Sequence, residues 1–132
     1  MNAALLFLRI ATSVVFLYHG SSILFGAFGG PGPARFAALL HVPLFVAYLV
    51  GIGQFFGAIG ILLGIFTRIA AGAIVVIMLG AIFMVHISHG FDLAHGGFEY
   101  AFTELLIAMA LAFTGPGAYS LAALMPPRLQ NL

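Results

Sequence analysis

The sequence predicts an all-α integral membrane protein, a bundle of four transmembrane helices joined by short loops. The 132 residues are 64% hydrophobic and 5% charged, with a mean hydropathy of +1.24. A soluble domain has about 25% charged residues, so four basic and three acidic side chains cannot cover a surface in water. A transmembrane helix needs about 20 apolar residues. The length therefore accommodates four helices as a single membrane domain over residues 1–132.

The first predicted helix covers residues 3–25 and ends at the Gly- and Pro-rich stretch 26–33, because clustered Gly and Pro break helices. Residues 34–41 are short and mildly amphipathic, which favours a helix lying in the membrane interface. Pro43 is suited to the start of a helix, and the second transmembrane helix is predicted over residues 44–66.

Thr67 and Arg68 form the predicted turn into a third helix over residues 69–88. A polar, Gly-rich loop separates this helix from the fourth, which is predicted over residues 98–114. A Gly-Pro-Gly sequence then stops the fourth helix, and residues 118–125 are expected to lie in the interface.

Four crossings would place both termini and the turn between the second and third helices on one side. That side would hold Arg9, Arg68 and Arg128, whereas the other side would hold Arg35. Cytoplasmic loops carry the excess of basic residues, so we expect both termini to face the cytoplasm. Arg9 lies near the cytoplasmic end of its helix and is expected to extend its guanidinium to the interface.

The second helix is rich in glycine and contains two GxxxG pairs, Gly53 with Gly57 and Gly60 with Gly64. Small residues are favoured at helix contacts in lipid because they let backbones approach closely. A face for homo-oligomerisation is one interpretation. Packing within the four-helix bundle is the favoured one, because this helix has to contact its neighbours in any case.

Polar side chains from all four helices are predicted to meet in the outer half of the bundle. Glu104 lies inside an apolar stretch, and a carboxylate at membrane depth is costly unless it faces the protein interior and has a partner. His19, Gln54 and His86 come from the other three helices at a similar depth. Tyr100 precedes Glu104 by four residues and shares its face of the helix. Helix bundles often build ligand sites from such inward-facing side chains.

We interpret these five residues as a pocket that handles protons beside an apolar ligand. A His and a Glu in a low-dielectric site can exchange a proton, and quinone chemistry requires proton donors and acceptors beside an apolar wall. The alternative is structural: a hydrogen bond from Glu104 to His19 or His86, with His19 a satisfied core histidine. We assign no catalytic residue, because the sequence contains no cofactor-binding motif.

Several other kinds of site are not expected. His86 and His89 are three residues apart, which resembles a metal or haem pair only weakly, so neither metal nor haem is expected. The chain has no cysteine, which excludes a disulfide framework and thiol chemistry. A net charge of +1 also argues against a nucleic acid partner.

Several sequence motifs together resemble the DoxX family of small four-helix membrane proteins. The first helix has an Arg near its start and a His-Gly near its end, and the second is a Gly-rich helix followed by Thr-Arg. The fourth helix starts with Phe-Glu-Tyr and is followed by Gly-Pro-Gly. These motifs occupy residues 6–20, 50–71, 98–100 and 114–121. The sequence departs from the family pattern at Gln54, where the family often has an acidic residue, and at Ile23, where it often has a lysine.

The resemblance implies a place in a membrane redox system, since family members include a quinone-linked oxidoreductase. We therefore expect an accessory subunit of a redox assembly in a prokaryotic plasma membrane. It would bind quinone without a covalent cofactor, and would assemble with other membrane subunits or with copies of itself. The alternative is a structural subunit that anchors a larger complex and has no chemistry of its own. A small-molecule carrier is a third reading, although the sequence shows no internal repeat and no broken central helix.

Overall fold

The computed structural model describes residues 1–132 and contains helices and no strands. Five α-helices follow one another along the chain: α1 (Asn2–Phe25), α2 (Gly32–Leu40), α3 (Leu44–Leu63), α4 (Thr67–Ala81) and α5 (Glu99–Thr114). Three stretches are long and apolar enough to cross a membrane, namely Asn2–Phe25, Leu44–Leu63 and Thr67–His89. Helix α5 is shorter, with 16 residues.

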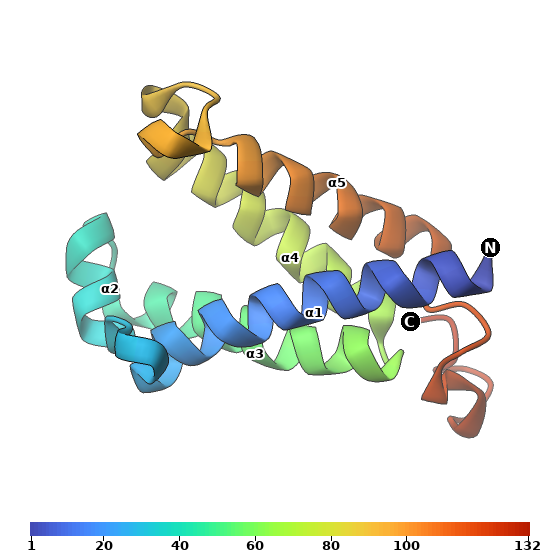
Figure 1. The fold of residues 1–132 in the computed structure, drawn as a ribbon. Helices are drawn as coiled ribbons and strands as arrows, with labels where there is room; N and C mark the ends of the chain where they lie inside the picture. The colour runs from blue at the N-terminus through green and yellow to red at the C-terminus, as the bar shows by residue number, and fades with distance from the viewer.

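The long helices form two pairs that diverge from a common end. Helix α1 packs along α3, and α4 packs along α5. The two pairs meet near the termini and the α3–α4 turn, and they spread apart toward α2 and the loop before α5 (Figure 1). One apolar core still joins all four helices, because Phe16, Ile61, Ile74 and Leu111 belong to the same buried cluster.

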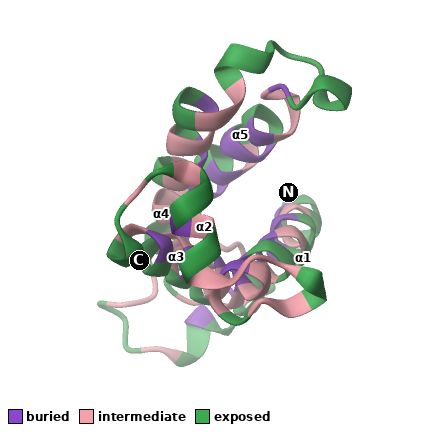
Figure 2. Cartoon of the chain, turned by 90° about the vertical axis from the view of Figure 1, so that its left-hand side faces the viewer, coloured by how far each residue is buried: buried purple, intermediate pink, exposed green.

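The outward faces of the helices are exposed (Figure 2), and many of their side chains are large and apolar. Large hydrophobic side chains on these faces include Phe7, Phe45, Val76 and Phe113. Monomeric soluble proteins rarely expose apolar patches of this extent. The surface is therefore that of a protein whose surroundings are a lipid bilayer.

Glycines allow α1 and α3 to lie close together. A Cβ added at Gly20 would lie 2.6 Å from the backbone nitrogen of Phe55, and one added at Gly51 would lie 2.7 Å from the side chain of Leu24. The GxxxG residue Gly53 faces α4 instead, where an added Cβ would lie 2.8 Å from Ile77 Cδ1. These glycines make contacts within the chain, as the favoured interpretation of the pattern expects.

Replacing Gly20 with alanine is expected to destabilise the protein by about 1–3 kcal/mol, because the new methyl group would overlap the backbone of α3 and force the helices apart. Thermal unfolding in detergent would measure the loss. Gly72→Ala is the matched control, since an added Cβ there meets nothing within 4 Å. Equal melting temperatures for the two variants would contradict the close approach of α1 and α3.

The α3–α4 connection differs in detail from the expected helices. Helix α3 ends at Leu63, three residues earlier than expected, because Gly64 adopts a left-handed conformation with φ of 71°. Helix α4 then begins at Thr67, two residues earlier than expected. Beyond Ala81 it continues as a π-helical turn (Ile82–His86) and a 3-10 turn (Ile87–His89). In the segment after α5, only Leu121–Leu124 forms a helical turn.

The expectation that Arg9 reaches the interface is wrong, because its side chain is 1% exposed. Its guanidinium donates to the carbonyl oxygens of Ile61 at 2.7 Å and Leu62 at 2.6 Å, at the end of α3. It also donates to Pro116 at 3.0 Å and Tyr119 at 2.6 Å, in the segment after α5. The last carbonyls of a helix lack partners within the helix and carry partial negative charge. A buried cation that binds two of them, and two further carbonyls after α5, replaces the water that a bilayer cannot supply.

Arg68 has a similar role at the end of α5. Its guanidinium donates to the carbonyl oxygens of Ala112 at 3.0 Å and Phe113 at 2.7 Å. Two arginines therefore bind the carboxyl ends of α3 and α5, both at the end of the molecule where the helix pairs meet (Figure 1).

Candidate functional site

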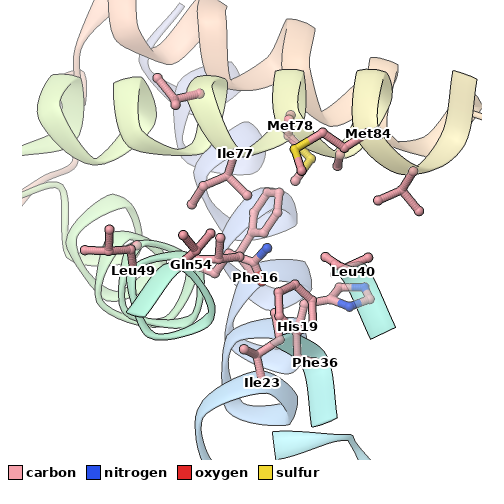
Figure 3. A pocket seen from close by; sticks show the side chains of 18 of the residues that line it. Phe16, His19, Ile23, Phe36, Leu40, Leu49, Gln54, Ile77, Met78 and Met84 are labelled. Carbon is pink, nitrogen blue, oxygen red and sulfur yellow. The ribbon is translucent and has the colours of Figure 1, made fainter. Parts of the chain in front are cut away.

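A cavity of about 630 Å³ lies where the two helix pairs diverge. Its volume falls within the range of about 300–1,000 Å³ that is typical of small-molecule sites. Of its 22 lining residues, 17 are hydrophobic. Phe16 and Ile23 of α1 face Ile77 and Met78 of α4 across this space (Figure 3). The walls suit a flat apolar ring.

Helix α2 covers the end of the cavity away from the termini. Phe36 and Leu40, four residues apart on one face of this helix, line the cavity (Figure 3). The sequence predicts an interfacial position for this segment and no part in the site. The apolar pair at helical spacing was the available signal, but it does not distinguish a cavity wall from a lipid-facing side.

The structure brings four of the five predicted site residues to this cavity. His19 of α1, Gln54 of α3, His86 of the π-helical turn and Tyr100 of α5 all line it. The rings of His19 and Tyr100 are 5.9 Å apart between centroids. The π-helical turn adds one residue to a helical turn, a feature that is frequent at functional sites.

Two of these side chains have buried polar atoms without a partner. Gln54 is 6% exposed, and its Oε1 makes no hydrogen bond; the hydroxyl of Tyr100 is likewise unpaired. Buried polar groups in native proteins are almost always hydrogen-bonded, and an unsatisfied one costs about 1–3 kcal/mol. Both atoms are buried beside the cavity, so a ligand would pair with them once the side chains rotate toward it. The cavity therefore has mainly apolar walls, with two hydrogen-bonding side chains among its lining residues.

Glu104 is buried behind this cavity rather than lining it. It is 6% exposed, and its Oε2 accepts a hydrogen bond from Thr12 Oγ1 at 3.2 Å. The expected partners were His19 and His86, but the hydrogen bond comes from α1 through Thr12. Thr12 lies seven residues before His19 and on the same helix face, so the spacing could have revealed it. Through Tyr100, one turn away on α5, the carboxyl group remains adjacent to the cavity.

His86 and His89 contact different backbone carbonyls. His86 Nδ1 lies 2.8 Å from the carbonyl oxygen of Gly96, whereas His89 Nδ1 lies 3.0 Å from that of Val85. The two imidazoles are thus held by different parts of the backbone. No group of three His, Cys, Asp or Glu side chains is arranged to hold a metal ion. His95 Nδ1 lies 3.1 Å from Asp92 Oδ2 in the exposed loop before α5.

Comparisons with known proteins confirm the family resemblance. The model of the DoxX family matches residues 4–87. The chain is 30% identical over 110 residues to a Bacillus subtilis (strain 168) protein named "Putative oxidoreductase CatD", a match that covers 83% of this chain and 78% of that protein. It is 32% identical over 125 residues to an uncharacterized protein of Haemophilus influenzae, covering 89% and 87% of the two chains. No solved structure matches the chain.

Proposed function

Because this chain is a membrane protein that belongs to the DoxX family, we propose that it is an accessory subunit of a quinone-linked redox assembly, with a quinone as the ligand of its cavity. The printed name of the Bacillus subtilis relative supports an association with oxidoreductases. The observation that carries the choice of ligand is the pair of unpaired polar groups, on Gln54 and Tyr100, beside a cavity with mainly apolar walls.

The groups around the cavity match the two ends of a quinone. The hydroxyl of Tyr100 and Nε2 of Gln54 can each donate a hydrogen bond to a quinone carbonyl oxygen. The hydroxyl of Tyr100 and the unpaired Oε1 of Gln54 can each accept one from a hydroxyl group of the quinol. Phe16 and Met78 lie beside the space that the ring would fill. The same two side chains therefore serve the oxidised and the reduced ligand.

Reduction of a quinone to a quinol consumes two electrons and two protons. We propose that the electrons come from a redox protein of the assembly and that His19 and Glu104 hold and transfer the protons. The imidazole of His19 lines the cavity, and the carboxyl group of Glu104 lies one helical turn behind Tyr100. Both groups can gain and lose a proton, which neither Gln54 nor the apolar walls can do.

We further propose that α5 also crosses the bilayer, giving four crossings with both termini in the cytoplasm of a prokaryote. Its 16 residues span about 24 Å, and it runs antiparallel to α4 (Figure 1). The termini and the α3–α4 turn lie at one end of the molecule, where Arg9 and Arg68 are also found. The distribution of basic residues favours the cytoplasmic side for that end.

Binding of menadione, a naphthoquinone without a tail, tests the proposal in lipid nanodiscs. Tyr100→Phe removes one hydroxyl group and is expected to weaken binding by about tenfold, because one buried hydrogen bond contributes about 1 kcal/mol or more. Gln54→Leu is expected to have a similar effect. Tyr18→Phe is the matched control, since Tyr18 is exposed and lies outside the cavity.

A wild-type protein that does not bind menadione would contradict the proposed function. Equal affinities for the wild type, Tyr100→Phe and Gln54→Leu would also contradict it. Either result would favour a subunit that only anchors or fills a larger membrane complex.

A further inference from the structure

A second hollow, of about 470 Å³, lies between α3 and α4 on the outside of the molecule. We call it the α3–α4 groove and define it by its lining residues, which include Gly53, Phe56, Gly57, Phe66, Ala70 and Ala73. Every lining residue is a glycine or has an apolar side chain. The groove therefore offers no hydrogen bond and suits a hydrocarbon chain.

The groove adjoins the cavity. Gly53 and Ala73 line both hollows, so the two lie next to each other along α3 and α4. From Gly53 it follows α3 to Leu63, a distance of about 15 Å along the helix. The unpaired amide of Gln54, which is 6% exposed and lines the cavity, is the next residue after Gly53. The polar head site and the apolar groove are thus neighbours on α3.

Small residues make the floor of the groove, and large ones make its sides. A Cβ added at Gly57 would lie 3.7 Å from the carbonyl oxygen of Ala70, which is an ordinary van der Waals contact. The absence of a side chain at Gly57 therefore deepens the groove. Phe56 and Ile69 stand at the sides and are exposed. The GxxxG spacing of α3 serves close packing at Gly53 and leaves open space farther along the helix.

We propose that the α3–α4 groove binds the apolar tail of the ligand whose head group occupies the cavity, so that the substrate class is the long-chain prenylated quinones. This inference rests on the proposed quinone-binding function. The tail is favoured over a loose lipid chain because the head group holds it at the mouth of the groove, which raises its effective concentration there. Burial of each methylene group then adds to the affinity of the whole ligand.

Two naphthoquinones with the same ring separate head from tail: menadione, which has no tail, and phylloquinone, which has a phytyl tail. Each affinity is measured in nanodiscs of one lipid composition and compared only between variants. Gly57→Leu fills the groove at a residue that does not line the cavity. We expect it to weaken phylloquinone binding by about tenfold, because several methylene groups lose their site, and to leave menadione binding unchanged.

Gly72→Leu is the matched control, because Gly72 is on α4, lines neither hollow, and has open space where its Cβ would lie. It should bind both quinones as the wild type does. Gly57→Ala, whose Cβ makes only ordinary contacts, keeps the test usable if the leucine variant does not fold. It should show a smaller loss of the same kind.

Crosslinking provides a second readout on the unmodified protein. A phylloquinone analogue with a diazirine on its tail should label peptides that contain Phe56, Phe66 or Ile69, and excess phylloquinone should suppress the labelling. Two results would overturn the tail site while menadione binding remained. One is a phylloquinone affinity of the Gly57 variants equal to that of the wild type. The other is labelling spread over the exposed side chains of α5. A wild-type protein that does not bind menadione would instead overturn the proposed function.

Discussion

Replacing Arg9 with leucine is expected to remove most of the folded protein. The guanidinium makes four hydrogen bonds to backbone carbonyls from within the protein interior. The substitution leaves the carbonyls of Leu62, Pro116 and Tyr119 without a donor, and an unsatisfied buried group costs about 1–3 kcal/mol. We expect a loss of at least about 3 kcal/mol in the free energy of unfolding, even though such terms are not additive. Unfolding in mixed detergent micelles would measure it.

Arg35→Leu is the matched control for this experiment, because Arg35 is exposed on α2 and makes no hydrogen bond through its side chain. Arg9→Lys should be intermediate, since an ammonium group lacks the planar fork that binds the end of α3 and the segment after α5 at once. If Arg9→Leu and Arg35→Leu unfold at the same detergent concentration, the four hydrogen bonds do not hold the helix ends together.

Replacing Glu104 with glutamine is expected to abolish the carboxyl signal that accompanies reduction of a bound quinone. The side chain keeps its size and its contact with Thr12, so the protein should still fold and bind menadione. The amide side chain of glutamine does not take up or release a proton near neutral pH. An electrochemically induced infrared difference spectrum of the menadione-bound protein would show a carboxyl C=O band in the wild type and none in Glu104→Gln.

Glu99→Gln is the control for this spectrum, because Glu99 is the other glutamate of the chain and its carboxylate accepts a hydrogen bond from the backbone of Leu93 in the exposed loop. That variant should keep the band. Thr12→Val should keep the band but shift its frequency, because it removes the donor at 3.2 Å. An identical band in the wild type and Glu104→Gln would show that this carboxyl group has a structural role only.

The positions of the helices could be predicted from the sequence because their signals are local. Apolar runs of sufficient length indicate the helices, and Gly26 and Gly115 stop them by adopting conformations that glycine favours. The end of α3 was less predictable. Ile65 and Phe66 are as apolar as the helix before them, so hydropathy extends the helix beyond the point where Gly64 ends it.

The divergence of the helix pairs and the surroundings of the buried charges could not be predicted. Depth along a helix indicates which residues lie at one level of the bilayer. His19, Gln54, His86 and Tyr100 were predicted together on this basis, and they line one cavity. It does not give the rotation of a helix about its axis, which turns Glu104 toward Thr12 instead of an imidazole. Arg9 depends on carbonyls from residues more than 50 positions away, and backbone acceptors leave no trace in the sequence.

The four hydrogen bonds of Arg9 to backbone carbonyls also have a consequence for biosynthesis. Two of its acceptors, the carbonyls of Pro116 and Tyr119, follow it by 107 and 110 residues. While the ribosome is still producing α5, a cation of the first helix has only half of its final acceptors, at a depth where water is scarce. Membrane insertion of the first helix should therefore stay reversible, or need help from the insertion machinery, until the last segment has been translated.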